Sequence, residues 1–376
     1  MKKAFIKYIQ LLFSIFPTRN IILFESIPDM EGNSRAVFDM MVKQGVNKKY
    51  KLVWIVDKKV SFNHIDVQNL FFISKPNTLF EKIIYMLRYF NAKIKITENF
   101  CYPKFHQRTF ALHLGHGTAI KNTGSLMFIN GAADYALYQS EFVKETTAKL
   151  YNLDVNNLIC LGMPRNDNLI NGSKVSAEEN YIVWLPTFRA SNSSNRIDSD
   201  YNFPLGIPIF NDVSEVQRLN DILRSHGTNL YIKPHFAARL DDLEIHDFSN
   251  IKVINDNFYK EKGLLFYEFL GMSKALITDY SSVYFDYLLL DRPIGITIDD
   301  LSQYEKRIGF VYDDFKKTIL GEYIENYTDL ENYILGCIKN SIDYRYLKER
   351  KELFNKFKDN HSAERVVNFI KEKANL

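Results

Sequence analysis

Short apolar runs alternate along the first half of the chain with longer segments whose apolar residues recur at helical spacing. The runs are typical of strands covered on both faces, because such strands are nearly continuous in hydrophobic residues. We predict strands at 21–25, 51–56, 70–74, 92–97, 109–114, 134–139 and 158–161. We predict helices between them, at 34–42, 79–89 and 140–151. Strands that alternate with helices indicate parallel βαβ units and an α/β sheet.

The second half of the chain repeats this pattern after a polar segment, 171–180, that is poor in apolar residues. Strands are predicted at 181–185, 229–233, 251–254, 275–278 and 294–298. Helices are predicted at 213–225, 264–270 and 283–290, and the C-terminal third is expected to be helical, ending with a helix at 362–373. We therefore place a domain boundary in the polar segment and predict three parts, 1–19, 20–172 and 173–376.

Length and composition agree with two α/β domains. The chain has 376 residues, which is too long for one ordinary domain, and its 46% of hydrophobic residues can fill two cores. The formal net charge of +3 is small for a nucleic-acid-binding protein, so nucleic acid is not an expected partner. Three cysteines without metal-like spacing indicate a reducing compartment. No apolar run is long enough to predict a transmembrane helix.

Residues 1–16 form a basic segment with helical periodicity, and no acidic residue precedes Glu25. In a helix, one face of this segment carries the apolar side chains Phe5, Ile6, Ile9, Leu12, Phe13 and Phe16. The opposite face carries Lys3, Lys7, Gln10 and Ser14. Such a helix is typical of a membrane surface, and packing on the chain's own first domain is the alternative. The interrupted apolar face and the lack of a small-residue cleavage site argue against a secretory signal.

The segment 274–293 joins a predicted strand to a predicted helix through the polar residues 279–282. Ser281 and Ser282 are natural N-cap residues, and they would lie beside the free N–H groups and the positive dipole end of the helix 283–290. Such a helix end can bind a phosphate group. A capped helix without a ligand explains the same residues equally well when they are taken alone.

Polar clusters follow four other predicted strands, at 115–118, 164–167, 186–189 and 233–235, and we expect 164–167 to lie in a loop. Ligands of α/β proteins bind at the carboxyl ends of strands, so we expect a site in a cleft between the two domains. The dinucleotide, Walker, nucleophile-elbow and zinc-protease motifs are absent from the sequence. The clusters supply two histidines, several cations and several hydroxyls. This set suits a nucleotide-diphosphate donor and a general base, with charge stabilised by side chains rather than by a metal.

In their order along the chain, these clusters resemble the motifs of the CDP-glycerol glycerophosphotransferase family, the teichoic-acid primases and polymerases. The matching elements are His116-Gly117-Thr118 followed by Lys121, Pro164-Arg165-Asn166-Asp167, Pro186-Thr187-Phe188-Arg189, Lys233-Pro234-His235, and Thr278-Asp279-Tyr280-Ser281-Ser282 followed by Asp286. The Arg-Gly pair that follows in the family is divided here by one residue, as Arg307-Ile308-Gly309. The family often has a tryptophan where this chain has Gly115. The resemblance covers residues 21–314, and the ordered set of motifs is much more specific than any one of them.

The resemblance implies a GT-B architecture, in which two Rossmann-like domains with parallel sheets face each other across a cleft. It implies transfer of glycerol phosphate, or in some members ribitol phosphate, from a CDP-alditol to a lipid-linked acceptor. An acceptor hydroxyl would attack the β-phosphorus, and CMP would leave. No cofactor is implied. The resemblance places the acceptor side in 20–172, the CDP-alditol side in 173–376, and the protein at the cytoplasmic face of the membrane.

The resemblance also implies roles for single residues. His116 is the expected general base, and His235 is expected to contact the donor phosphate or to act as a second acid or base. Arg189, Ser281 and Ser282 are expected to hold the diphosphate. The further substrate-binding candidates are Lys121, Arg165, Lys233, Thr278, Asp279, Asp286 and Arg307. For Arg165 and Asp286, a structural role is an equally good interpretation.

Two other classes of protein remain open. A glycosyltransferase of the same architecture would use a nucleotide sugar and release a nucleoside diphosphate. A membrane-associated scaffold would turn over no nucleotide donor at all. The nucleotide product therefore separates the three hypotheses.

Overall fold

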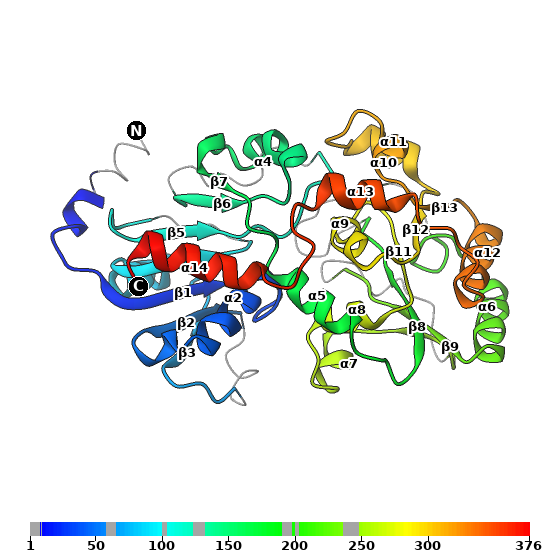
Figure 1. The fold of residues 1–376 in the computed structure, drawn as a ribbon, viewed down its shortest axis with the longest axis horizontal. Coiled ribbons are helices and arrows are strands. Elements are labelled where there is room, and N and C mark those ends of the chain that lie inside the picture. The colour runs from blue at the N-terminus through cyan, green and yellow to red at the C-terminus, as the bar shows by residue number, and fades with distance from the viewer. Residues whose placement is uncertain are drawn as a thin grey trace. The chain divides into compact units, whose positions relative to one another are not determined.

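The computed structural model describes residue 8 and residues 10–57, 65–99, 104–122, 132–189, 198–199, 203–235 and 248–376. The chain folds into two compact units, and each unit is built on a parallel sheet (Figure 1). The first unit comprises Met1–His116, Gly124–Asp167 and Lys356–Leu376, and the second comprises Gly117–Thr123 and Asn168–Asn355. Neither unit is therefore one continuous stretch of sequence.

Among the described residues, the sheet of the first unit has seven parallel strands in the order β3-β2-β1-β4-β5-β6-β7. The strands are β1 (Arg19–Glu25), β2 (Lys51–Val56), β3 (Leu70–Ser74), β4 (Ala92–Thr97), β5 (Phe110–His113), β6 (Tyr135–Leu137) and β7 (Leu158–Ile159). Ile22 of β1 lies opposite Leu52 of β2 and Ile94 of β4, and all three side chains are fully buried. Burial on both faces explains why these strands are continuous apolar runs in the sequence.

Helices cover both faces of this sheet. Helix α2 (Gly32–Lys43) and helix α14 (Ser362–Ala374) lie together on the face that carries Phe24 and Trp54 (Figure 1). Helix α3 (Leu79–Tyr89) covers part of the opposite face through Tyr85 and Tyr89. The remaining elements are the short 3-10 helices η1 (Val46–Lys48), η3 (Glu141–Val143) and η4 (Val155–Asn157), helix α4 (Lys144–Tyr151), and helix α5 (Arg165–Ser173), which continues into the second unit.

In the part of the second unit that the structure describes, the sheet has six parallel strands in the order β10-β9-β8-β11-β12-β13. The strands are β8 (Asn180–Leu185), β9 (Thr228–Ile232), β10 (Ile251–Val253), β11 (Ala275–Thr278), β12 (Ile294–Thr297) and β13 (Glu322–Ile324). The strand order changes direction between β8 and β11. In α/β proteins, ligands bind beyond the carboxyl ends of the strands at such a point.

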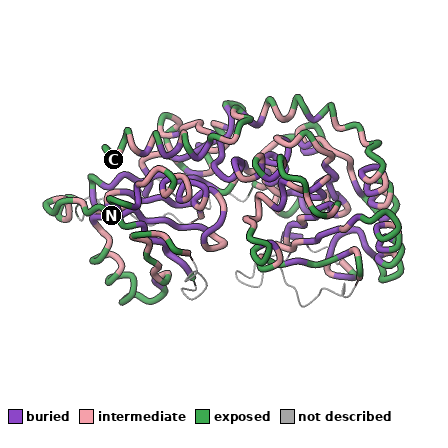
Figure 2. The backbone as a smooth tube through the Cα atoms, turned by 60° about the horizontal axis from the view of Figure 1, so that its bottom comes forward, coloured by how far each residue is buried: buried purple, intermediate pink, exposed green. Residues whose placement is uncertain are grey.

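One core of the second unit lies between this sheet and two amphipathic helices, α6 (Val213–Ser225) and α12 (Tyr327–Ile338). Trp184 and Ile277 of the sheet pack there, and Figure 2 shows buried chain, in purple, inside each unit. The other helices are α7 (Asp256–Lys260), α8 (Phe266–Met272), α9 (Val283–Tyr287), η5 (Leu288–Leu290), α10 (Leu301–Arg307), α11 (Phe315–Thr318) and α13 (Leu347–Phe354).

The predicted strands of both halves are present, with small shifts at their ends, so the α/β fold class with two parallel sheets is confirmed. Three local predictions were wrong. The C-terminal third, which we expected to be helical, also contributes strand β13 to the second sheet, because Glu322–Ile324 pairs with β12. The helix expected at 283–290 is the short α9 followed by the 3-10 turn η5. The Phe285 carbonyl, which a continuing α-helix would pair with residue 289, instead accepts from Asn355 Nδ2 at 2.8 Å.

The third local error concerns residues 164–167, which we expected in a loop. Helix α5 begins there, at Arg165. The backbone N–H of Arg165 donates to Asn33 Oδ1 at 3.0 Å, so a side chain from a distant part of the chain satisfies the start of this helix. Local sequence holds no signal for such a partner.

The division into units also differs from the one expected at 172–173. The chain passes into the second unit after Asp167, and the segment Gly117–Thr123 already belongs to that unit. At the other end, Lys356–Leu376 belongs to the first unit. The reason is that Val366, Val367 and Ile370 of α14 are fully buried in the core of the first sheet.

Residues 1–7 and 9 of the amphipathic helix predicted at 1–16 lie outside the described residues. The segment 10–16 packs on the first unit, because Phe13 and Phe16 contact the ring of Phe90 at centroid distances of 4.5 and 5.8 Å. The side chains of Leu11 and Ile15 remain exposed. Within the described part of the chain, no helix has both the length and the apolar character needed to cross a bilayer.

Candidate functional site

The structure divides the predicted site residues between the two units. His116 and Arg165 belong to the first unit. The second unit holds the others, which are Lys121, Arg189, Lys233, His235, Thr278, Asp279, Ser281, Ser282, Asp286 and Arg307. His116 follows β5, and the loops after β8, β9 and β11 carry most of the second group. Both groups therefore gather near the carboxyl ends of parallel strands.

His116 lies in a loop whose backbone requires glycine on both sides. Gly115 has a φ of 64° and Gly117 a φ of 127°, values that residues with a side chain rarely adopt. A Cβ on Gly115 would also lie 2.2 Å from the hydroxyl oxygen of Tyr151. The side chain of His116 is exposed, so its imidazole can meet a bound substrate and accept a proton from a hydroxyl.

Arg165 is buried rather than directed to solvent. Its Nη1 donates to the carbonyl oxygen of His116 at 2.7 Å. It also helps to stabilise the negative charge of Glu98, because it acts to lower the pKa of that carboxyl group. Of the two interpretations of Arg165, this geometry favours the structural one over direct substrate contact.

Two buried titratable groups lie close to this loop. His113 on β5 has its Nδ1 3.1 Å from Thr97 Oγ1, and its ring meets Tyr151 edge-on. Burial, together with the nearby charges of His116 and Lys95, lowers the pKa of His113 to about 3, so its ring is neutral near pH 7.

Glu98, just beyond β4, is the second group. Its Oε2 accepts from the Ser34 N–H at 2.8 Å, in the first turn of α2. Burial raises the pKa of Glu98 to about 7, although hydrogen bonds and Arg165 act in the opposite direction. The carboxyl group therefore titrates near neutral pH.

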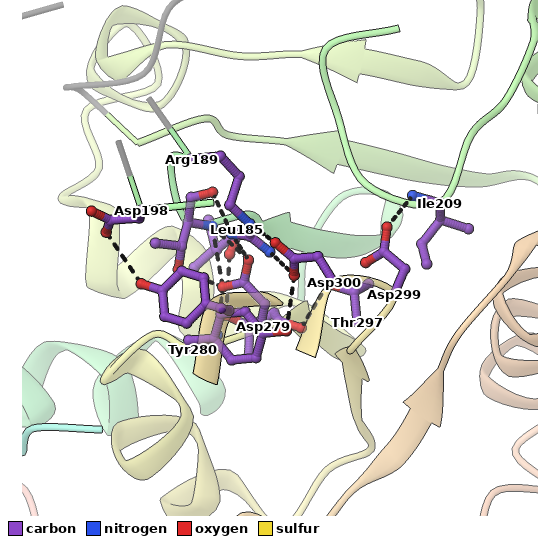
Figure 3. Close-up of polar contacts among 12 residues, drawn as sticks. Leu185, Arg189, Asp198, Ile209, Asp279, Tyr280, Thr297, Asp299 and Asp300 are labelled. Carbon is purple, nitrogen blue, oxygen red and sulfur yellow. Dashed lines mark hydrogen bonds and ion pairs between the residues drawn. The ribbon is translucent and has the colours of Figure 1, made fainter. Parts of the chain in front are cut away.

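In the second unit, Arg189 is the centre of a buried network (Figure 3). Its Nε and one Nη donate to the two carboxylate oxygens of Asp300, at 2.6 and 3.0 Å. Its other Nη donates to Asp279 Oδ2 at 2.8 Å and to the Thr187 carbonyl at 2.9 Å. The Tyr280 hydroxyl donates to Asp300 Oδ1 at 2.9 Å. Below, these five residues are the Arg189 network.

Burial alone would lower the pKa of Arg189, but Asp279 and Asp300 outweigh it and raise this pKa, so the guanidinium stays charged. The side chains of Arg189 and Asp279 are 6% and 0% exposed. Asp279 also accepts from the N–H and the hydroxyl of Thr187. The charges of Arg189 and Asp279 are paired inside the network, and the network joins the loops after β8, β11 and β12. This geometry favours a positioning role for both residues.

A second, more open group surrounds the ring of Phe188, the neighbour of Arg189. The His235 ring lies 5.0 Å from the Phe188 ring, centroid to centroid, and Lys121 Nζ lies 5.7 Å from that centroid. The three side chains are half-buried, so they retain contact with solvent. Below, Lys121, Phe188 and His235 are the Phe188 cluster. It brings together two predicted residues that are far apart in the sequence.

Lys121 reaches this cluster because its segment is anchored in the second unit. The Asn122 N–H donates to the Gly309 carbonyl at 3.0 Å, and the Val311 N–H donates to the Ile120 carbonyl at 2.9 Å. Lys121 and Phe310 form an antiparallel bridge between these bonds. Arg307, an exposed residue at the end of α10, comes just before this bridge in the sequence.

Lys233, another predicted site residue of the second unit, is half-buried. Its Nζ pairs with Asp256 Oδ1 at 3.0 Å and lies 4.9 Å from the centroid of the Phe266 ring. Lys233 follows β9 and precedes His235 by two positions. Its positive charge therefore lies next to the Phe188 cluster in the sequence, at the end of the same strand.

Thr278 and Asp286 point into the protein. Thr278 Oγ1 donates to the Leu185 carbonyl at 3.1 Å, and Asp286 Oδ2 accepts from the Tyr267 hydroxyl at 2.8 Å. Both residues are fully buried. For Asp286, too, this geometry favours the structural interpretation.

Ser281 and Ser282 are half-buried, between the Arg189 network and α9. Ser281 Oγ accepts from the Val283 N–H at 3.4 Å, which is a long hydrogen bond. Ser282 occupies the N-cap position but makes no side-chain cap hydrogen bond. The N-cap interactions expected here are therefore weak for Ser281 and absent for Ser282.

Several residues of these groups were not selected from the sequence. Asp300 follows a predicted strand, as the other clusters do, so its position was a usable signal. Phe188 lies within a matching motif, but nothing indicated that its ring would gather Lys121 and His235. His113 and Glu98 stand at the ends of apolar runs, and Asn33 stands in a segment without a motif. Their roles depend on contacts between distant segments, which periodicity does not report.

Two parallel sheets with Rossmann-like strand orders, each with polar residues beyond its strand ends, define a GT-B protein. A solved structure of the wall teichoic acid polymerase TagF, a variant soaked with CDPG, superimposes with a TM-score of 0.74 at 17% identity, over 95% of this chain and 90% of that chain. The GT-B fold class is thereby confirmed.

The sequence comparisons are more specific. The model of the family CDP-glycerol:poly(glycerophosphate) glycerophosphotransferase matches residues 8–372, and the chain belongs to this family. A teichoic acid glycerol-phosphate transferase of Staphylococcus aureus is 25% identical over 96% of this chain and 95% of its own length. A teichoic acid glycerol-phosphate primase of Bacillus subtilis is 23% identical over 90% and 89%. The resemblance found in the motifs is confirmed.

Proposed function

We propose that this enzyme transfers glycerol phosphate from CDP-glycerol to a hydroxyl group of a lipid-linked acceptor and releases CMP. The observation that carries the proposal is the Phe188 cluster. It places a lysine and an imidazole together, beside the strand-order change between β8 and β11. A partly exposed pair of this kind suits the negative charge of a diphosphate. The family and the names of the two relatives support glycerol phosphate as the transferred group.

The donor would bind to the second unit. Lys121 and His235 would contact the diphosphate, and Lys233 would contribute positive charge nearby. The Ser282 hydroxyl, which makes no cap bond, would donate to a phosphate oxygen. Arg189 would act through the protein, because its guanidinium holds the loops that carry these residues in place.

The chemistry needs one proton acceptor and stabilisation of developing charge. His116 would take the proton of the acceptor hydroxyl. The hydroxyl oxygen would then form a bond to the β-phosphorus, and the bond between this phosphorus and the bridging oxygen would break. CMP would leave with the bridging oxygen, and the cations of the second unit would balance its charge.

Ribitol phosphate is the alternative group for the same reaction, because a teichoic acid ribitol-phosphate primase is also a relative of this chain. Incubation with CDP-glycerol, CDP-ribitol and UDP-sugars, with analysis of the nucleotide product, tests the proposal. We expect CMP from CDP-glycerol in the presence of an isolated membrane fraction as the acceptor source. Release of UDP from a UDP-sugar would instead support a glycosyltransferase, and no release from any donor would support a scaffold.

The acceptor would be reached at a membrane surface, and exposed apolar side chains in the first unit support this. On α3, Leu79 is 76% and Phe80 71% exposed, and Ile83, Ile84 and Leu87 are exposed as well. Leu11 and Ile15 are exposed as well, in a segment that packs against Phe90 at the end of α3.

The charges near this face suit an anionic bilayer. Arg19, Lys82 and Arg88 are exposed, and Glu81 is engaged in the capping box at the start of α3. Each basic residue near an anionic surface contributes about 1 kcal/mol of attraction. The face defined by residues 10–16 and α3 would therefore lie on lipid.

Sedimentation with vesicles that contain an anionic phospholipid tests this face. Deletion of residues 2–16, and separately the double substitution Leu79→Ser and Phe80→Ser, should each reduce the bound fraction. Val213→Ser is the matched control, because Val213 is an exposed apolar residue of the second unit. Binding that is unchanged in both altered proteins would contradict the membrane assignment.

A further inference from the structure

The backbone of the His116 loop is held by two side chains from other segments. Asn33, fully buried at the start of α2, donates from Nδ2 to the Gly115 carbonyl at 2.8 Å. Arg165 donates from Nη1 to the His116 carbonyl at 2.7 Å. The first carbonyl belongs to the peptide before His116 and the second to the peptide after it. Both peptide planes that set the φ and ψ of His116 are therefore fixed.

The two holding residues are themselves joined. Asn33 Oδ1 accepts from the Arg165 backbone N–H at 3.0 Å, so one side-chain amide binds both α5 and the loop. This amide uses its donor and its acceptor on different segments, a combination that aspartate and alanine do not reproduce. Asn33 is thus the connection between three stretches of chain that lie far apart in the sequence.

Glu98 holds the backbone around Asn33 in place. The Glu98 carboxyl group accepts from the next backbone N–H of α2, that of Ser34, at 2.8 Å. It also lies against Gly32, where an added Cβ would be 2.2 Å from Glu98 Oε1. The first turn of α2 therefore packs on a buried carboxyl group, and Asn33 projects from a firmly held backbone.

A loop of this kind needs such support. The glycines on both sides of His116 have positive φ values and give the free chain many conformations. The imidazole itself is exposed. Hydrogen bonds to the two flanking carbonyls are a direct means of selecting one backbone conformation and so one direction for the imidazole.

We propose that Asn33 is a positioning residue for His116, which acts through the two peptides beside that histidine and does not contact the substrate. This inference rests on the proposed function, in which His116 accepts the proton of the acceptor hydroxyl. Misplacement of a reacting group by about 1 Å can reduce a rate by roughly 100-fold. We therefore expect Asn33→Ala to reduce kcat by about 10- to 100-fold while the dissociation constant for CDP-glycerol stays at the parental value.

Two further variants test whether the side-chain amide of Asn33 is responsible for the effect. Asn33→Asp keeps an acceptor for the Arg165 N–H but loses the donor to the Gly115 carbonyl, so its kcat should fall as well. Asn47→Ala is the matched control, because Asn47 is another buried asparagine of the first unit and donates from Nδ2 to the Gln68 carbonyl. The Asn47→Ala variant loses a hydrogen bond of the same kind at a position away from the His116 loop, so it should keep the parental kcat. Thermal unfolding of each protein shows that the measured sample is folded.

The decisive comparison is a double-mutant cycle with His116→Ala. If Asn33 acts through His116, then Asn33→Ala adds almost no further loss of kcat once the imidazole is gone. A second, independent 10-fold loss in the double variant would overturn the inference, and so would parental kcat in both folded Asn33 variants. If Asn33→Ala does not fold, the same cycle with Asn33→Asp decides the matter, and failure of both to fold would assign Asn33 to stability instead. Parental turnover in His116→Ala would contradict the general base itself, and is thus distinguishable from failure of the Asn33 inference.

Discussion

The loop around His116 in the first unit and the Arg189 network in the second unit use polar residues in opposite ways. At His116, buried groups such as Asn33 and Arg165 bind the backbone and leave the imidazole exposed. In the Arg189 network, the charged side chains form ion pairs with one another, and their charged groups are buried. His116, the proposed proton acceptor, is exposed on a supported backbone, whereas the charges that hold loops together are buried and paired.

This difference separates the motif residues into two kinds. His116, His235, Lys121 and Ser282 are exposed or half-buried and can meet a ligand. Arg189, Asp279, Arg165, Asp286 and Thr278 are buried and hydrogen-bonded within the protein. We therefore propose that burial separates the motif residues that bind a ligand from those that hold the loops in position.

The largest expected effect is on turnover. Removal of a general base typically reduces a rate by about 100- to 10,000-fold. We expect His116→Ala to lose kcat by this order in an assay of CMP release. The matched control is His226→Ala, because His226 is an exposed histidine that follows α6 in the second unit. Retention of more than about a tenth of parental kcat in His116→Ala would require another base, and His235 would be the first to test.

The next effect concerns stability. Arg189→Ala leaves Asp279 and Asp300 buried without their cation, and breaking a buried ion pair in this way costs about 3–5 kcal/mol. Urea unfolding should therefore show a lower free energy of unfolding of the second unit. The control is Arg345→Ala, which removes an exposed ion pair with Asp343 and should change stability by less than about 1 kcal/mol. An Arg189→Ala protein as stable as the parent, with only donor binding lost, would make Arg189 a ligand residue after all.

A smaller effect is expected on the pH dependence of the free energy of unfolding. The folded protein raises the pKa of Glu98 to about 7, from its ordinary value of 4.5. Between these values, the folded state keeps the proton that the unfolded state loses. Stability therefore falls as the pH rises through this window, and the contribution of Glu98 is on the order of 3 kcal/mol at most.

Glu98→Gln removes this titration while keeping a hydrogen-bond acceptor for Ser34. Its free energy of unfolding should fall less steeply between pH 5 and pH 7 than that of the parent. Glu145→Gln, at an exposed position of α4, is the control and should keep the parental slope. Identical slopes for Glu98→Gln and the parent would mean that Glu98 is not held protonated by burial.

The smallest effect is on donor affinity. If the Ser282 hydroxyl donates to a phosphate oxygen, its loss in Ser282→Ala costs on the order of 1.5–3 kcal/mol. Calorimetry should then show a rise of about tenfold or more in the dissociation constant for CDP-glycerol. Ser281→Ala is the companion variant, because its hydroxyl already interacts with the Val283 N–H. Equal affinity in Ser282→Ala and the parent would place the diphosphate elsewhere.

Much of the fold was predictable because it follows from local pattern. The strands around Ile22, Trp54 and Ile277 are buried on both faces and so appear as continuous apolar runs. The motif residues were found because they follow these runs directly. The family resemblance added the chemistry, which the pattern alone left open.

The remainder depended on contacts between distant segments. Asn33 lies 132 positions from Arg165, and Arg189 lies 111 positions from Asp300, so no local window contains either pair. The segment with Lys121 joins the second unit through residues 309–311, although the sequence around it belongs to the first. Helix α14 returns to the first sheet after the whole second unit. Each of these features depends on tertiary contacts, which hydrophobic periodicity does not encode.

The central claim is that the proton acceptor is supplied by the first unit and the donor site by the second. Calorimetric titration of CDP-glycerol into His116→Ala and His235→Ala, measured side by side with the parent, tests it most directly. The account predicts a parental dissociation constant for His116→Ala and a dissociation constant raised by about tenfold or more for His235→Ala. The reverse pattern, with donor affinity lost in His116→Ala and kept in His235→Ala, would contradict it.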